Sequence, residues 1–153
     1  MSIQPEIKVV RLEGTPEDWP LPSYETAGAA GADICAFLPE GDVEFKPGAR
    51  GLVRTGLAFE IPDGFEVQVR PRSGLALKQG LMLVNSPGTI DSDYRGEIGV
   101  IVLNAGKDPV RIRHGMRIAQ LVVAPVVQAA FKGSDTLSGT DRGSGGFGST
   151  GVA

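Results

Sequence analysis

The segment from Val84 to Val100, V-N-S-P-G-T-I-D-S-D-Y-R-G-E-I-G-V, gathers more groups that could form a site than any other stretch. It holds an amide, two carboxylates and a phenol ring, and Ser86-Pro87-Gly88 is a turn signal between apolar runs. We therefore expect a hairpin-like element. In an extended strand Asp91 and Asp93 would face one side and Tyr94 the other. A solvated turn whose aspartates bond their own backbone is the alternative, and the segment alone leaves both open.

A second candidate site lies at the start of the one short helix that the sequence predicts. In P-R-S-G-L-A-L-K-Q-G, Ser73 can cap the helix and Gly80 can end it. Arg72, Ser73 and Gly74 then combine a cation, a hydroxyl and bare backbone N–H groups at a positive helix end, which suits a phosphate. An ordinary helix cap beside a surface arginine explains these residues equally well.

The glycine-rich end of the chain offers a third anion-binding pattern. The stretch G-S-G-G-F-G-S-T, from Gly143 to Thr150, approaches the phosphate-loop pattern G-x-x-x-x-G-K-[ST], with Ser149 in place of the lysine. We expect no strand before it and no helix after it, which argues against an ordinary phosphate-loop NTPase fold. Its backbone N–H groups can still cradle an anion beside Arg142. Phe147 has no evident core to join there, which favours a role in closing over a ligand.

Short strands joined by turns must position these groups. The chain has 22 Gly and 11 Pro, and this density of breakers predicts short strands and no long helix. Segments 52–61 and 65–70 alternate apolar and polar residues around Pro62-Asp63-Gly64, so we expect a β-hairpin there. Strands are also expected over residues 7–12, 32–38, 98–103, 110–112 and 117–123. Gln120 falls on the apolar-looking side of the last one and needs a partner if buried.

The pattern of strands without alternating helices predicts an all-β fold, an antiparallel sandwich or barrel. Residues 1–132 carry the apolar runs and form one domain, long enough for a real core. Residues 133–153 are rich in Gly, Ser and Thr and cannot pack a core of their own. We expect them to form a flexible tail unless something orders them.

Composition argues against several kinds of protein. A net charge of −3 disfavours a general nucleic-acid binder, although a few arginines in one cleft can bind a small phosphorylated ligand. A single Cys and a single His argue against a zinc site and exclude an intrachain disulfide. We expect Cys35 to be a buried, inert thiol and His114 to be a surface residue. The sequence shows no secretory signal and no membrane span, so we expect a cytoplasmic protein.

Five stretches, in this order, resemble the motifs of the trimeric dUTP diphosphatases (dUTPases). They are A-G-A-D-I, P-R-S-G-L, G-T-I-D-S-D-Y-R-G, R-I-A-Q-L and R-G-S-G-G-F-G-S-T-G, and they span Ala30 to Gly151. One motif alone is weak evidence, whereas five in register are highly specific. The resemblance implies a jelly-roll-like β fold assembled as a homotrimer. Its active sites would lie between subunits and be closed by the tail of a third.

The reaction implied by the resemblance is hydrolysis of dUTP to dUMP and pyrophosphate with Mg²⁺, which limits uracil incorporation into DNA and supplies dUMP for thymidylate synthesis. By motif position Asp91 is the general base that activates water for attack on the α-phosphorus, and Asp93 supports the turn. Arg142 acts as an arginine finger on the triphosphate. Asp33 faces the metal through water, since Mg²⁺ keeps its waters beside triphosphate oxygens. Arg117 could bridge subunits.

The resemblance also assigns the substrate contacts. Tyr94 lies flat against the deoxyribose and leaves no room for a 2′-hydroxyl, and Phe147 stacks over the uracil. A narrow pocket excludes the thymine methyl, and the donor and acceptor pattern rejects cytosine. The family often has a larger residue at the position of Gly99. The uracil edge pairs with Asn85 and with the backbone near Gly88, Thr89, Ile90 and Gly99. The phosphates are held by Arg72, Ser73, Gly74, Gln120, Gly148, Ser149 and Thr150.

Two other functions compete with this interpretation. The related dCTP deaminases share the fold, but deamination needs a general acid or base beside the base ring, usually a Glu. Glu97, beyond Gly96, does not match that pattern. The second competitor is a catalytically silent β-sandwich trimer that senses a nucleotide or binds a partner protein. Intact Asp91, Arg142 and Phe147 argue against it.

Overall fold

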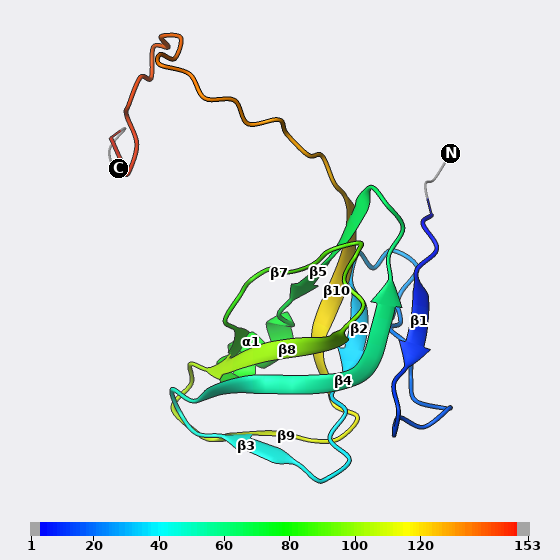
Figure 1. Cartoon of the computed structure of the whole chain (residues 1–153). Coiled ribbons are helices and arrows are strands. Elements are labelled where there is room, and N and C mark those ends of the chain that lie inside the picture. The colour runs from blue at the N-terminus through cyan, green and yellow to red at the C-terminus, as the bar shows by residue number, and fades with distance from the viewer. Residues whose placement is uncertain (1–3, 150–153) are drawn as a thin grey trace.

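The computed structural model describes residues 4–149 as two four-stranded sheets, a small third sheet and one helix (Figure 1). The first sheet has the order β1-β4-β8-β6, the second has the order β2-β10-β5-β7, and β3 pairs with β9. All of these pairs are antiparallel. The expected all-β, jelly-roll-like sandwich with one short helix is confirmed. The elements are β1 (Lys8–Arg11), β2 (Ala32–Cys35), β3 (Val43–Phe45), β4 (Arg50–Glu60), β5 (Phe65–Arg70), α1 (Ser73–Gln79), β6 (Leu81–Leu83), β7 (Gly88–Ile90), β8 (Glu97–Asn104), β9 (Val110–Ile112) and β10 (Arg117–Pro125).

The hydrophobic core draws alternate side chains from both four-stranded sheets, because successive residues of a strand point to opposite faces. In β8 the buried apolar residues are Ile98, Val100 and Val102, and in β5 they are Val67 and Val69. All five belong to one apolar cluster. The alternation that the sequence showed over residues 65–70 therefore identified the buried face of β5 correctly.

The predicted hairpin around Pro62-Asp63-Gly64 is wrong. β4 pairs with β1 and β8 in the first sheet, whereas β5 pairs with β10 and β7 in the second. The turn between β4 and β5 therefore joins the two sheets. Alternation indicates which residues are buried, but it is compatible with any antiparallel partner. β5 takes β10 as a partner along its whole length, from Phe65↔Pro125 to Arg70↔Gln120.

The hairpin expected between Val84 and Val100 is wrong for the same reason. β7 pairs with β5 in the second sheet, and β8 pairs with β4 and β6 in the first. Between them the chain crosses from one sheet to the other. A hydrogen bond from Tyr94 N–H to the carbonyl oxygen of Asp91 (3.2 Å) makes this crossing a turn. The extended geometry predicted for Asp91, Asp93 and Tyr94 is therefore absent.

The helix α1 follows β5 where the sequence predicts it. Gly80 ends it with φ 67°, and its N–H donates to the carbonyl of Ala76 at 3.0 Å. A Cβ at Gly80 would lie 2.6 Å from the backbone nitrogen of Gly106, so only glycine fits. The expected cap by Ser73 is wrong, because Arg72 occupies the N-cap position and no side chain caps the helix.

In the part of the chain that the structure describes, no helix has the length and hydropathy to cross a bilayer.

The chain leaves the sheets after β10, and Figure 1 shows the tail extending away from them in orange and red. Val126 N–H still donates to the carbonyl oxygen of Gly64 at 2.9 Å, but every residue from 127 to 144 is exposed. A flexible tail beginning at residue 133 stays a prediction.

Asn104, at the end of β8, is a buried polar residue that ties three segments together. Its amide donates to the carbonyls of Phe45 and Asp108, both at 2.8 Å, and its Oδ1 accepts from Gly106 N–H at 2.9 Å. We predict that Asn104→Ala lowers the free energy of unfolding by about 3 kcal/mol, because it leaves buried backbone groups without partners. Urea denaturation measures this change.

The matched control is Ser134→Ala. The Ser134 hydroxyl also donates to a backbone carbonyl, that of Thr136 at 2.6 Å, but it lies in the exposed tail. Its loss should change stability by less than about 0.5 kcal/mol. Equal losses in the two variants would contradict a structural role for Asn104.

Candidate active site

A pocket of about 190 Å³ opens where the chain crosses from β7 to β8. Its wall combines the strand β7, the crossing turn and the first half of β8. Seven residues that the sequence analysis assigned to substrate or water line it together: Asn85, Gly88, Thr89, Ile90, Asp91, Tyr94 and Gly99. A single chain therefore assembles one half of the predicted site.

Two glycines allow close packing in this pocket. A Cβ on Gly88 would lie 3.1 Å from Nδ2 of Asn85, so the amide packs directly against the backbone of β7. A Cβ on Gly99 would lie 2.6 Å from Cδ1 of Leu52. The same pocket is lined by apolar side chains such as Val69. The wall thus mixes apolar side chains with polar groups, which suits a ligand that carries both kinds of surface.

Asp91 lies where two hollows meet. It borders the pocket and also a wider groove that Asp63, Glu66 and Asp93 line. Its side chain is exposed, so water has access to the carboxylate. Asp93 borders only the wider groove, so the two aspartates differ in position.

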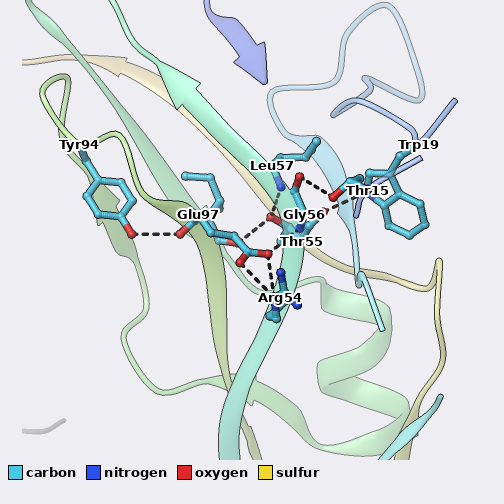
Figure 2. Close-up of polar contacts among 9 residues, drawn as sticks. Thr15, Trp19, Arg54, Thr55, Gly56, Leu57, Tyr94 and Glu97 are labelled. Carbon is cyan, nitrogen blue, oxygen red and sulfur yellow. Dashed lines mark hydrogen bonds and ion pairs between the residues drawn. The ribbon is translucent and has the colours of Figure 1, made fainter. Parts of the chain in front are cut away.

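Glu97, the first residue of β8, lines the pocket and was missed as a site residue by the sequence analysis. Its carboxylate accepts from Arg54 Nε at 3.0 Å and from Gly56 N–H at 2.9 Å (Figure 2). Its carbonyl oxygen accepts from the Tyr94 hydroxyl at 3.0 Å. Only the pairing of β4 with β8 brings Arg54 and Gly56 to this carboxylate, so no local signal in the sequence identifies it.

A second group of predicted residues surrounds Asp33 in β2. Arg72 Nε lies 3.1 Å from Oδ1 of Asp33, and Arg117 Nη1 lies 3.2 Å from Oδ2. Arg117 also pairs with Glu25 at 2.9 Å, and Arg72 donates to the carbonyl oxygen of Arg117 at 3.1 Å. The side chain of Asp33 is only 10% exposed, so the two cations compensate a charge that burial penalises. We call Glu25, Asp33, Arg72 and Arg117 the charged cluster.

Gln120 lies opposite Asp33 in the pairing of β10 with β2. Its Nε2 donates to the carbonyl oxygen of Pro71 at 2.9 Å, which is the partner that a half-buried amide needs. Ser73 and Gly74 follow Arg72 and are exposed. Arg72, which the sequence analysis assigned to the phosphates, is part of the charged cluster. The other phosphate-binding residues predicted in the β domain, Ser73, Gly74 and Gln120, lie next to it.

Asp33 is the side chain that the sequence analysis placed near a metal. Residues 4–149 contain no group of three His, Cys, Asp or Glu side chains placed to hold an ion. Both oxygens of Asp33 already face arginines, so direct ligation would disturb an ion pair. A Mg²⁺ ion held mainly by a triphosphate, with its waters facing Asp33, agrees with these contacts.

The predicted tail residues do not reach the pocket of their own chain. Arg142 Nε donates to the carbonyl of Gly145 at 2.8 Å, inside a turn of the tail. Phe147 is fully exposed with φ 51°, and Gly148 has φ 84°. A second turn follows, in which Ser149 N–H donates to the carbonyl oxygen of Gly146 at 3.0 Å, and Figure 1 shows this end of the tail away from the sheets. Thr150, the last predicted contact, lies outside the described residues.

Cys35 and His114 do not line the pocket. Cys35 is half-buried, and desolvation is the main cause that raises the pKa of its thiol, which makes it a poor nucleophile. His114 is exposed, as expected, although its ring packs 4.8 Å from that of Trp19 and its Nδ1 accepts from Leu38 N–H at 2.9 Å. Packing accounts for both residues.

Comparison with known proteins identifies the family. The dUTPase family model matches residues 17–151. The deoxyuridine 5'-triphosphate nucleotidohydrolase of Roseobacter denitrificans is 66% identical over 145 residues, which cover 95% of each chain. The protein of the same name from Beijerinckia indica is 58% identical over 148 residues, 96% of this chain and 92% of the other.

A solved structure agrees with these sequence matches. The dUTPase of Staphylococcus bacteriophage 80alpha with dUPNHPP has a TM-score of 0.83 and 26% identity, and the alignment covers 96% of this chain and 99% of that one. The match of the family model, residues 17–151, includes the pocket, the charged cluster and the turn of the tail. This chain therefore belongs to the dUTPase family.

Proposed function

We propose that this protein hydrolyses dUTP to dUMP and pyrophosphate. The observation that carries the proposal is the pocket that brings Asn85, Asp91 and Tyr94 together with the backbone of β7. The names of relatives that share more than half of its residues along nearly the whole chain support it. The reaction would limit uracil incorporation into DNA and supply dUMP for thymidylate synthesis.

Asp91 is the general base of the proposed reaction. Its carboxylate is exposed at the edge of the pocket, where it can take a proton from a water molecule. The water oxygen forms a bond to the α-phosphorus, and the bond from that phosphorus to the bridging oxygen breaks. Pyrophosphate leaves with the electron pair. A placed general base contributes roughly 10²–10⁴-fold to such a reaction.

The pocket recognises the base and the sugar in this proposal. The Asn85 amide and the backbone from Gly88 to Ile90 offer donors and acceptors to the uracil edge, and the Tyr94 ring excludes a 2′-hydroxyl. Buried polar groups left unpaired by cytosine give stronger discrimination than a pocket that must reject one extra methyl. Gly99 adds only its backbone to the wall.

Arg72 of the charged cluster, with Ser73, Gly74 and Gln120, binds the phosphates. Asp33 orients Arg72 through an ion pair of 3.1 Å, so the guanidinium is placed before the substrate arrives. Mg²⁺, held mainly by the triphosphate and facing Asp33 through water, would neutralise charge on the phosphate oxygens. Together these groups bind a triphosphate on a chain whose net charge is −3.

The remaining part of the site comes from another subunit of a homotrimer. In one chain the tail lies away from the sheets that hold the pocket (Figure 1). The fifth motif, which lies in this tail, would therefore act by closing over the site of a neighbouring subunit. Arg142 then neutralises charge on the triphosphate, and Phe147 stacks over the uracil. Gly148, Ser149 and Thr150 hold the γ-phosphate. Closure would expel water and complete the site only around the right nucleotide.

Deamination of dCTP is the competing reaction on this fold. The only glutamate of the central segment is Glu97, and its carboxylate is engaged by Arg54 and Gly56. A general acid or base must reach the base ring, so these contacts favour hydrolysis. A cytoplasmic location, without nucleic-acid or membrane partners, completes the proposal.

Product analysis across the nucleoside triphosphates tests the proposal. We expect dUMP and pyrophosphate from dUTP with Mg²⁺, much slower release from dCTP, dTTP and UTP, and loss of turnover when EDTA removes the metal. Ammonia from dCTP would instead identify a deaminase. Binding of dUTP without any product would identify a nucleotide sensor.

Asp91→Asn tests the assignment of the general base. We expect the rate constant kcat for dUTP to fall about 10³-fold, because the amide cannot take the proton from water. The dissociation constant of a non-hydrolysable dUTP analogue should stay within about threefold of the wild-type value, a difference of less than about 0.7 kcal/mol. Steady-state kinetics and calorimetry measure the two quantities.

Asp93→Asn is the matched control for Asp91→Asn. It removes the neighbouring carboxylate, which borders the wider groove and not the pocket. Its kcat should remain within a few-fold of wild type. Near-normal turnover by Asp91→Asn would remove Asp91 as the base.

Truncation after Ser138 tests the proposed role of the tail. The truncated chain should keep its Tm and its oligomeric state, because residues 139–144 are exposed. Its kcat/KM for dUTP should fall by about 10³-fold, the effect of losing an arginine finger. Asp141→Asn, which changes the exposed charge beside Arg142, is the control and should behave as wild type. A fully active truncated protein would contradict closure by the tail.

A further inference from the structure

Strand β4 carries a bulge opposite the start of β8. The pairing of the two strands shifts between Arg54 and Ala58. Within the shift, Gly56 adopts φ 71°, and a Cβ there would lie 2.7 Å from Oγ1 of Thr15. Only glycine fits this position, and the bulge leaves its N–H without a place in the regular ladder.

Side chains satisfy the polar backbone groups of this bulge (Figure 2). The carbonyl oxygen of Thr55 accepts from Trp19 Nε1 at 2.9 Å, and that of Gly56 accepts from the Thr15 hydroxyl at 3.1 Å. The N–H of Gly56 donates to Oε1 of Glu97 at 2.9 Å. The carboxylate of Glu97 thus takes the place that a backbone carbonyl of β8 would have in a regular sheet.

Arg54 holds the same carboxylate from the other side. Its Nε lies 3.2 Å from Oε1 and 3.0 Å from Oε2 of Glu97, and its guanidinium lies 5.7 Å from the ring centre of Phe37. The side chain of Glu97 is 24% exposed, so this ion pair is less open to solvent than an ordinary surface pair. Strand β4 therefore fixes the side chain of Glu97.

The backbone of Glu97 in turn holds the ring of Tyr94. The Tyr94 hydroxyl donates to the Glu97 carbonyl oxygen at 3.0 Å, across the turn that Figure 2 shows. A Cβ on Gly96 would collide with the Tyr94 hydroxyl, so the end of the ring lies against bare backbone. Tyr94 is 47% exposed, so packing alone confines the ring only partly.

We propose that Glu97 is a positioning residue that, with Arg54 and the bulge at Gly56, fixes the Tyr94 ring and thereby sets the discrimination between deoxyribose and ribose. The inference rests on the proposed function and adds to it Glu97, whose carboxylate is engaged within the protein, and Arg54 and Gly56, which do not line the pocket. When the carboxylate is removed, the Thr55 hydroxyl still donates to the Ile98 carbonyl oxygen at 2.6 Å, but Gly56 N–H and Arg54 no longer hold Glu97 itself. The Tyr94 ring can then move toward solvent and leave room for a 2′-hydroxyl.

Glu97→Ala tests the inference through the ratio of kcat/KM for dUTP to kcat/KM for UTP. We expect the ratio to fall about tenfold, equivalent to about 1.4 kcal/mol, chiefly through a gain with UTP. The matched control is Glu60→Ala, which removes an exposed carboxylate at the end of β4 that pairs with Lys8 at 2.8 Å. The control should leave the ratio unchanged.

A double-mutant cycle with Tyr94→Phe separates positioning from general stability. If Glu97 acts through the Tyr94 hydroxyl, Glu97→Ala should change the ratio little in a chain that already carries Tyr94→Phe. Purely additive effects of the two substitutions on the ratio would overturn the inference. A lower Tm with an unchanged ratio would overturn it as well.

Milder variants cover the case in which Glu97→Ala does not fold. Glu97→Gln keeps an acceptor for Gly56 N–H and loses the ion pair. Arg54→Ala removes the ion pair together with the contact of the guanidinium with the Phe37 ring. Each should lower the ratio by about threefold, or about 0.7 kcal/mol. An unchanged ratio in both would overturn the inference and leave the proposed function standing. Wild-type protein that does not hydrolyse dUTP would overturn the proposed function, and this inference with it.

Discussion

The assignment of β7 and β8 to different sheets is the constraint on which the site depends. Both strands pack against one core, so the residues from Asp91 to Gly96 must cross from one sheet to the other. A crossing segment lacks a ladder partner, and it places a carboxylate and a phenol ring at a pocket instead of in the core. The bulge of β4 anchors the far end of this crossing through Glu97.

The second constraint is that a nearly buried carboxylate must be compensated by positive charge. Asp33 is nearly buried, and Arg72 and Arg117, from segments far apart in the sequence, converge on its two oxygens. One carboxylate thus orders two cations before any phosphate is present. The pocket and the charged cluster lie in one chain, whereas the end of the tail lies away from the sheets. This division agrees with the proposal that the site is shared between subunits.

Local patterns in the sequence predicted the strand segments and the helix and drew attention to the segment from Val84 to Val100. The roles of Asn85, Gly88, Tyr94 and Gly99 came from the resemblance to the dUTPases. Strand partners were not predictable, because alternating burial is the same whether β5 pairs with β4 or with β10. The role of Glu97 was missed for the same reason, since the pairing of β4 with β8 brings Gly56 to it across the sheet. The cap by Ser73 failed because a possible cap is only a propensity, and Arg72 took the position.

The most direct test of the account is a crystal structure of the full-length protein with a non-hydrolysable dUTP analogue. The account predicts that the uracil lies against Asn85 and β7, the sugar lies against Tyr94, and the α-phosphorus lies beside Asp91. It also predicts that a tail from another subunit covers the nucleotide. A uracil bound elsewhere, such as in the groove bordered by Asp63 and Glu66, would contradict it.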